Sequence, residues 1–125
     1  IQSNAVEQAR VAALNMAGRH VASRGNMALN VLDTLGLVST SFGKWWGEPG
    51  GGTAELIDAR DFRYLCLQFD GDVLIGATAI GLTEHVGVLR GLIEGRVRLG
   101  PWKDRLLAEP LRFPDAYLAR AQAAA

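Results

Sequence analysis

The sequence predicts an α+β domain in which helices pack against an antiparallel β-sheet of about four to five strands. Apolar residues recur at helical spacing before residue 23 and after residue 83, whereas residues 27–80 are rich in Val, Leu, Ser and Thr and carry glycine breaks. The expected strands also follow one another through short turns, without helices between them. Strands connected in this way pair antiparallel, and helices then pack against the sheet.

A first helix is expected from Asn4 to about Ala22. Asn4 and Glu7 have the spacing of a capping box, in which the two side chains satisfy free amides at a helix start. A polar stretch at 24–26 that contains glycine ends the pattern. The apolar stripe consists mainly of small residues: Val6, Ala9, Ala13, Leu14, Ala17 and Val21. Because a stripe this flat lets another backbone approach closely, the helix is expected to need a neighbour.

The middle of the chain is expected to supply the sheet. Residues 27–46 indicate one or two strands, with Gly36 and Gly43 as breaks, and the glycine-rich stretch 47–53 indicates an exposed loop. Three further strands are expected to form a meander, at residues 55–60, 62–69 and 73–80. Asp70, Gly71 and Asp72 supply the tight hairpin turn between the last two strands.

The last third of the chain is expected to be helical. Thr83 is expected to cap a helix that ends at about Glu94, and a short helix from Pro101 to about Ala108 precedes a final helix after Pro114. The buried stripe of the longer helix is formed by Val86, Leu89, Leu92 and Ile93. The same helix carries Gly87, Gly91 and Gly95 at steps of four. Each glycine costs about 1 kcal/mol in helix propensity, so this face is expected to be a contact surface, between subunits or within one.

Composition and charge exclude several classes of function. The chain has 125 residues, of which 13 are basic and 13 acidic, so no net charge attracts nucleic acid or an anionic membrane. A single cysteine excludes an internal disulfide framework and fits a reducing compartment. No apolar run approaches the ~20 residues that span a bilayer. A cytoplasmic protein without a nucleic-acid or membrane partner is therefore expected.

The reactive side chains lack the neighbours that catalysis or metal binding requires. Cys66 lies within an expected strand without a partner cysteine or an adjacent histidine, which favours a buried, inert thiol. His20 and His85 do not have the spacing of metal ligands. Carboxylates at turns ordinarily serve turn geometry and solubility, and this applies to Glu55, Asp58, Asp61, Asp70 and Asp72. We therefore expect no catalytic residue and no metal.

The remaining motifs have ordinary structural explanations. The loop at 47–53 lacks both the GxGxxG spacing and the Lys-Ser/Thr of a P-loop. The basic run from Arg90 to Arg112 is interrupted by acidic residues, which favours surface ion pairs. Trp45 and Trp46 leave two interpretations open. Either one ring lies in the core and the other packs under the loop, or one ring is exposed for a partner or ligand.

Several segments resemble the FAD-dependent pyridine nucleotide oxidoreductases, in particular the group of nitrite reductase, rubredoxin reductase and NADH oxidase relatives. The stretch NAVEQARVAALNMAG at 4–18 is similar to the end of that family's FAD-binding domain. Two stretches are similar to parts of its C-terminal dimerisation domain, NVLDTLGLVSTSFG at 30–43 and DVLIGATAIGLTEHVGVLRGLI at 72–93. The stretch WKDRLLAEPLRFPDAYLA at 102–119 fits the family's tail.

The resemblance implies a division of the chain and a set of site residues. Residues 1–25 would be the terminal helix of an upstream FAD-binding domain, and residues 26–125 would be a C-terminal dimerisation domain. The N-terminal amides of the first helix would face the flavin, with Asn4, Ala5, Val6 and Gln8 nearest to it. The interface of a homodimer, or the acceptor side of the flavin, would involve Gly87, Gly91, Gly95, Trp45 and Trp46.

The parent protein that the resemblance implies is an oxidoreductase that passes electrons from NAD(P)H through FAD to an acceptor, such as an electron-acceptor protein. The chain lacks glycine-rich nucleotide motifs and the ribitol-binding Asp, and it lacks the HP motif of the acid–base pair found in glutathione reductase relatives. By itself it is therefore expected neither to catalyse nor to bind FAD stably. Two alternatives stay open: a free-standing α+β module that binds a small ligand or a protein without flavin, and a thiol-dependent enzyme that uses Cys66.

Overall fold

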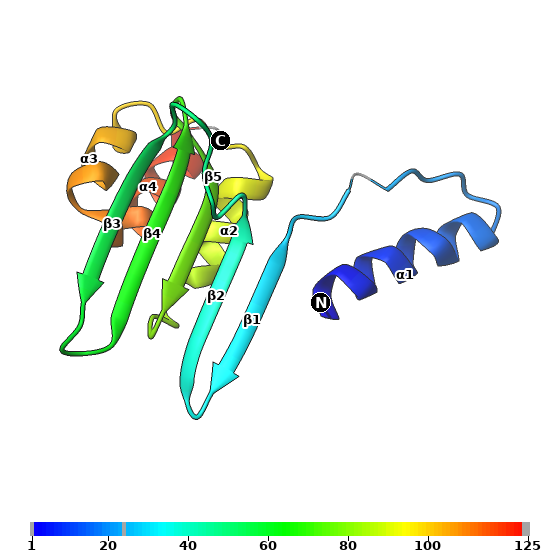
Figure 1. Ribbon diagram of the computed structural model, residues 1–125. Coiled ribbons are helices and arrows are strands. Elements are labelled where there is room, and N and C mark those ends of the chain that lie inside the picture. Colours follow the sequence, from blue (N-terminus) through cyan, green and yellow to red (C-terminus); the bar gives the residue numbers. More distant parts are fainter. Residues whose placement is uncertain (1, 24, 124–125) are drawn as a thin grey trace.

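The computed structural model describes residues 2–23 and 25–123. Five strands in it form one antiparallel sheet with the order β1-β2-β5-β4-β3 (Figure 1). The strands are β1 (Leu29–Thr34), β2 (Leu37–Gly43), β3 (Gly52–Asp58), β4 (Arg63–Asp70) and β5 (Val73–Ile80). The predicted antiparallel sheet is confirmed, and the stretch expected to hold one or two strands contains two. The meander β3-β4-β5 is also present, and β2 pairs with its last strand.

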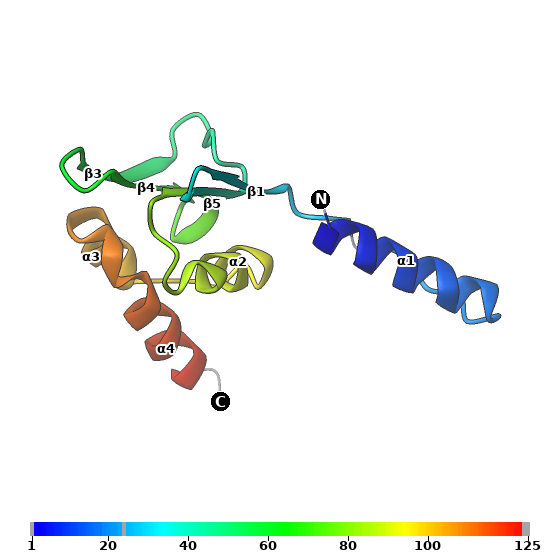
Figure 2. The ribbon, with the colours of Figure 1, turned by 90° about the horizontal axis from the view of Figure 1, so that it is seen from below.

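The described residues also form the helices α1 (Gln2–Met16), α2 (Val86–Glu94), α3 (Trp102–Ala108) and α4 (Phe113–Ala123), with a 3-10 turn η1 (Pro110–Arg112) before α4. Helices α2, α3 and α4 all lie against one face of the sheet, as Figure 2 shows. We call this the inner face. The opposite, outer face carries no helix among the described elements. The predicted α+β class is therefore confirmed.

The hydrophobic core lies between the inner face and the helices. Alternation along β4 places Leu65, Leu67 and Phe69 on the inner face, where each is 0% exposed. The neighbouring strands and the helices complete the core with Phe42, Ala54, Leu74, Ala77, Ala79, Leu89, Leu92, Leu106, Phe113 and Ala116. The residues that alternate with these, such as Tyr64 and Gln68, point to the outer face. The sequence pattern thus decides which face of the sheet the helices cover.

Strand limits agree closely with the predicted ones for β4 and β5, whereas β2 ends at Gly43 instead of continuing to Trp46. Strand β5 spans the predicted residues 73–80. Strand β3 begins at Gly52 instead of residue 55, because Gly52 and Thr53 pair with the end of β4. The connection before it spans residues 44–51, so it begins and ends earlier than predicted, and Gly47 within it is buried. Backbone pairing with a partner strand stabilises these residues in a way that their own propensities do not indicate.

Helix α1 ends at Met16, six residues before the predicted end. Asn15 causes this end, because its side chain exchanges two hydrogen bonds with the backbone of Val21, at 2.8 and 3.1 Å. Gly18 follows with a φ of 80°, the left-handed conformation that commonly terminates helices. The predicted capping box is also wrong. Asn4 lies inside the helix, and its amide nitrogen donates to the carbonyl oxygen of Met27 at 3.2 Å.

Helices α2 and α4 also begin at positions other than the predicted ones. Helix α2 begins at Val86, because the preceding His85 has a φ of 60° and so cannot continue a helix backwards to Thr83. Helix α4 begins at Phe113, before Pro114, which fits the first turn because proline needs no amide partner there. Helix α3 follows Pro101 and ends at Ala108, as predicted.

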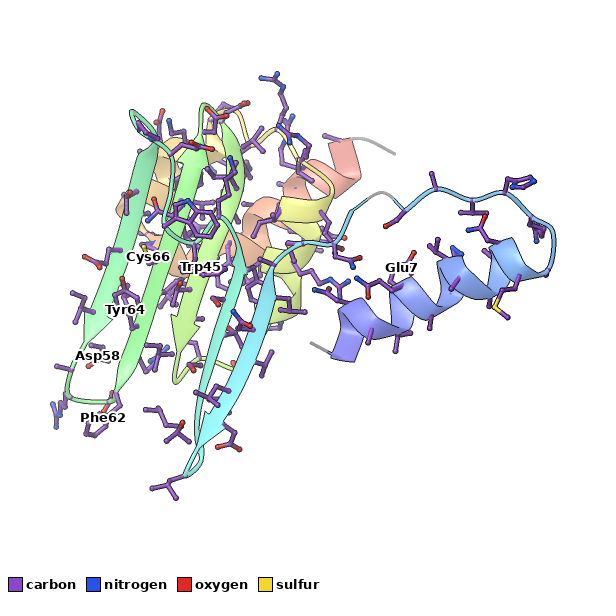
Figure 3. The ribbon with its side chains drawn as sticks, turned by 45° about the vertical axis from the view of Figure 1, so that its right-hand side comes forward. Glu7, Trp45, Asp58, Phe62, Tyr64 and Cys66 are labelled. Atoms are coloured by element: carbon purple, nitrogen blue, oxygen red, sulfur yellow. The ribbon has the colours of Figure 1, made fainter. Side chains whose placement is uncertain are left out.

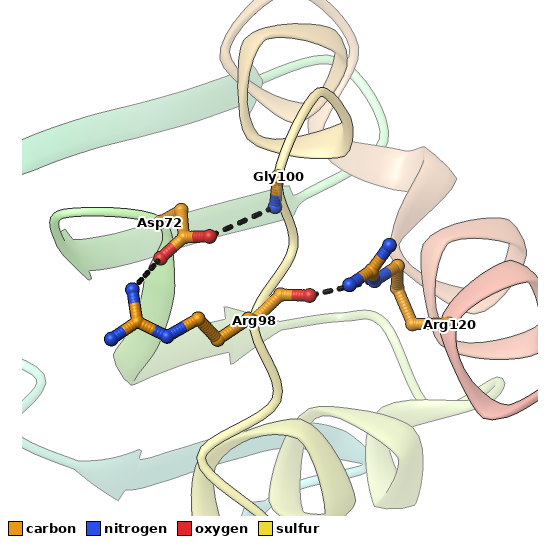
Figure 4. A network of polar contacts seen from close by, with 4 residues as sticks. All are labelled: Asp72, Arg98, Gly100 and Arg120. Carbon is orange, nitrogen blue, oxygen red and sulfur yellow. Dashed lines mark hydrogen bonds and ion pairs between the residues drawn. The ribbon is translucent and has the colours of Figure 1, made fainter. Parts of the chain in front are cut away.

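A polar network holds the helical layer to the β4–β5 turn (Figure 4). Asp72 accepts from the guanidinium of Arg98 and from the backbone N–H of Gly100, each at 3.1 Å. Arg120 of α4 then donates to the carbonyl oxygen of Arg98 at 2.7 Å. Asp72, expected only to support its own turn, therefore also fixes the segment between α2 and α3.

Candidate functional site

Helix α1 projects beside the edge strand β1, away from the core (Figure 1). Its predicted apolar stripe is largely exposed: Val6 is 63% exposed, Ala9, Ala13 and Ala17 are exposed, and Leu14 is half-buried. Met16 at its end is 89% exposed. The neighbour that this stripe was predicted to need is absent from the part of the chain that the structure describes.

A cleft of about 1340 Å³ separates the start of α1 from the rest of the domain. One wall comes from α1, the second from the chain before and within β1, and the third from the end of α2. Its lining includes Asn4 and Val6 of α1, Asn30 of β1, and Arg90 and Arg96 at the α2 end. Of the four flavin-facing residues that the resemblance implies, Asn4 and Val6 line this cleft. Ala5 and Gln8 are exposed on α1 outside its lining.

The outer face is a second candidate surface, because strand register aligns its side chains in rows across all five strands. We call the row nearest the β1–β2 and β3–β4 hairpin tips the apolar row; it consists of Leu32, Ser39, Ile80, Tyr64 and Ile57. The next row, which we call the central row, consists of Asn30, Ser41, Thr78, Cys66 and Glu55. Figure 3 shows Tyr64 and Cys66 side by side on this surface.

Polar contacts on the outer face connect β3 and β4. The phenol of Tyr64 donates to Oε1 of Glu55 at 2.7 Å, and Thr53 donates to Oε1 of Gln68 at 2.8 Å. The amide of Gln68 lies 3.3 Å from the sulfur of Cys66, which is buried as predicted. The hydrogen bond to Glu55, together with burial and the nearby thiol of Cys66, raises the pKa of Tyr64 well above its ordinary value. Tyr64 is thus held in its neutral, donating form.

The raised pKa of Tyr64 predicts a loss of stability at alkaline pH. The unfolded chain releases the Tyr64 proton above about pH 10, whereas the folded chain keeps it, so the free energy of unfolding should fall as pH rises beyond that point. Tyr64→Phe removes this contribution. Urea denaturation at a series of pH values should therefore show a shallower alkaline decline for Tyr64→Phe than for the native chain, and equal slopes would contradict the prediction.

Trp45 and Trp46 lie outside the core, in the turn that follows β2. They are 36% and 65% exposed, and their rings meet edge to face with centroids 4.7 Å apart. The interpretation with one ring in the core is therefore wrong. The turn crosses the outer side of Gly76, where an added Cβ would lie 2.1 Å from the carbonyl oxygen of Lys44. Because the chain leaves the strand here, the alternation that the prediction assumed does not apply to these residues.

The three glycines of α2 have different surroundings. Gly91 faces another helix of the same chain, and an added Cβ there would be 3.4 Å from the Tyr117 ring of α4. Gly87 faces open space, and Gly95 lies at the helix C-terminus. This distance is an ordinary van der Waals contact, so packing against Tyr117 does not by itself require glycine at position 91. Contact of the glycine face with a second subunit stays a prediction.

The other predicted features lie on the surface. His20 and His85 are exposed. The basic run forms ion pairs, as predicted, including Arg90 with Glu94 at 3.0 Å. Within residues 2–23 and 25–123, no group of three or more His, Cys, Asp or Glu is arranged to hold a metal ion. Among the helices of this same part of the chain, none is both long and apolar enough to cross a membrane.

Sequence reasoning missed three features of the candidate sites. It did not identify Tyr64 as the hydrogen-bond partner of Glu55. In the β3–β4 register Tyr64 lies opposite Ile57, so Glu55 is its diagonal neighbour on the same face. It did not identify Arg90 and Arg96 as cleft residues. It also missed the exposed apolar residues at the hairpin tips, for which Leu35 and Phe62 beside turns were the available signal.

The fold and its surfaces define a two-layer α+β domain with a projecting N-terminal helix, a cleft beside that helix and an uncovered sheet face. No protein-family model matches the chain, and no curated protein matches it.

Proposed function

We propose that this chain is the C-terminal part of an FAD-dependent NAD(P)H oxidoreductase, in which it forms part of the wall beside the flavin and a contact between subunits. The observation that carries the proposal is the exposed apolar stripe of α1. Val6 is 63% exposed, and the alanine ridge lies uncovered. An isolated amphipathic helix of this length has marginal stability in water, so a partner for its apolar face is expected. An upstream FAD-binding domain would supply that partner.

The cleft supports a position for the flavin beside the first turns of α1. Its volume of about 1340 Å³ is larger than that of a typical small-molecule pocket and leaves room for an isoalloxazine ring. Asn4 donates its amide N–H to the carbonyl oxygen of Met27, and its Oδ1 is the acceptor that it would offer to a ligand. The amides at the start of α1 carry partial positive charge, which favours an electron-rich ligand edge.

Bound FAD would supply the hydride and electron chemistry. The residues of this chain would orient the ring and exclude water: Val6 offers an apolar contact, and Asn4 a hydrogen-bond acceptor. The sequence contains no turn with the GxGxxG spacing that holds a pyrophosphate. Stable FAD binding would therefore depend on the upstream domain. The acceptor, including an electron-acceptor protein, would approach from outside the described chain.

The protein encoded by the complete gene tests this proposal. We expect it to purify with a flavin absorption band that NADH or NADPH bleaches. Val6→Asp should lower FAD occupancy at least tenfold, because it places a carboxylate on the cleft wall nearest to the helix start. Met16→Asp, at the other end of the same helix, is the matched control and should retain FAD. A protein that stays colourless after incubation with FAD would rule out the proposal.

The second candidate is a free-standing α+β module that binds a small ligand or protein without flavin. The uncovered outer face with its exposed tryptophans favours this candidate. The same purification separates the two candidates, because only the first requires flavin.

A further inference from the structure

The outer face has two exposed apolar ends that are separated by the central row. At one end, the turn with Trp45 and Trp46 crosses the sheet above Gly76. At the other end lie the apolar row and Phe62, which is 72% exposed. Gly81 lies between residues of the two hairpins at this end. An added Cβ there would be 2.2 Å from the carbonyl oxygen of Phe62 and 3.5 Å from the side chain of Leu37.

These two ends lie at equal distances from the central row. Along β5, Gly76 precedes Thr78 by two residues, and Ile80 follows it by two, so each end is roughly 7 Å from the central row along the strand. The central row itself consists of small or polar side chains, such as Ser41 and Thr78. A second sheet can therefore approach closely at the centre while bulkier side chains meet at both ends.

We propose that the outer face is the contact between two copies of this chain, related by a two-fold axis that runs along the central row. We call the turn that contains Trp45 and Trp46 the tryptophan turn. This axis places the tryptophan turn of each copy over the apolar row and Phe62 of the other copy. The contact is isologous, since each end meets the opposite end of the partner. The inference depends on the proposed function in one respect only, namely that the upstream domains occupy the side of α1.

The area of this face favours a second copy as its partner. Five strands of six to eight residues present roughly 550 Å² per copy, or about 1,100 Å² in total, which passes the ~1,000 Å² expected of a specific interface. Glu55 is the one charged residue in the apolar and central rows, and it accepts a hydrogen bond from Tyr64. Because the axis runs along the central row, the Glu55 carboxylates of the two copies face each other, and their repulsion weakens the contact.

The other surfaces of the domain do not compete for this position. The hydrogen bond from Asn4 to Met27 holds the start of α1 near β1, and the end of α2 lines the cleft beside it. An upstream domain that precedes α1 would therefore lie beside the sheet and its helices. The α2 glycines lie in the helical layer, on the opposite side of the sheet from Trp45 and Trp46. One two-fold contact therefore cannot contain both sets of residues.

Sedimentation equilibrium of the 125-residue chain tests the inference without flavin. We expect a monomer–dimer equilibrium in which Trp46→Ser and Phe62→Asn each raise the dimer Kd at least tenfold. Phe62 has a φ of 52°, a conformation that asparagine tolerates well, so Phe62→Asn should not weaken the fold. Circular dichroism and thermal melting establish that each variant is folded.

Two controls lie on the helical side. Leu118→Gln removes a side chain of α4 that is 57% exposed, and Gly87→Arg places a large group on the α2 glycine face. Both should leave the dimer Kd within about twofold of the native value. The inference is overturned if the native chain is monomeric at its highest soluble concentration, or if Gly87→Arg abolishes the dimer while Trp46→Ser and Phe62→Asn preserve it. Either result leaves the flavin test of the complete protein unaffected.

Discussion

Gly76→Ala should destabilise the domain by about 3 kcal/mol or more. A Cβ at this position would lie 2.1 Å from the carbonyl oxygen of Lys44 and 2.6 Å from the backbone nitrogen of Trp45. Both neighbours are backbone atoms, so no side-chain rotation relieves the overlap. The turn has to leave the sheet, which moves Trp45 and Trp46 into solvent. Urea denaturation measures the loss of stability, and a red shift of tryptophan emission reports the displaced turn.

Gly87→Ala is the matched control for this substitution. An added Cβ at Gly87 meets no atom within 4 Å, and the residue lies inside α2. Alanine restores up to about 1 kcal/mol of helix propensity, so this variant should be slightly more stable than the native chain. If Gly76→Ala unfolds at the same urea concentration as Gly87→Ala, the tryptophan turn does not cross the sheet as described.

Leu106→Ala should cost about 3 kcal/mol of unfolding free energy. Leu106 is 0% exposed and is the buried residue through which α3 joins the core. Its truncation removes apolar contacts and leaves a cavity that the rigid sheet cannot fill, and such changes typically cost 2–5 kcal/mol. The adjacent Leu107 is 41% exposed, so Leu107→Ala should cost less than about 1 kcal/mol. Similar denaturation midpoints for the two variants would contradict the packing of α3.

Local patterns predicted most elements of the fold. The apolar run at 73–80 and the Asp70–Gly71–Asp72 turn identified the β4–β5 hairpin, and Pro101 identified the start of the α3 region. The burial of Cys66 followed from its place within a strand. These features depend on residues close together in the sequence, so periodicity and turn chemistry are sufficient to predict them.

The candidate sites depend on contacts between distant parts of the chain. The end of α1 is set by the side chain of Asn15 and the backbone of Val21, which compete with an apolar period that continues further. The cleft requires Asn4 to meet Met27. Neither contact has a signal in periodicity, because each depends on a specific hydrogen bond that forms only when the chain reverses direction.

The sequence by itself determined the α+β class, the antiparallel pairing and the apolar residues that face the helices. Tertiary structure alone decided that all the packed helices cover one face, that α1 projects with its apolar stripe exposed, and that Trp45 and Trp46 lie over Gly76. The physical reason is that side-chain alternation fixes the two faces of each strand. Strand order, register and chain reversal then decide which residues become neighbours across the sheet.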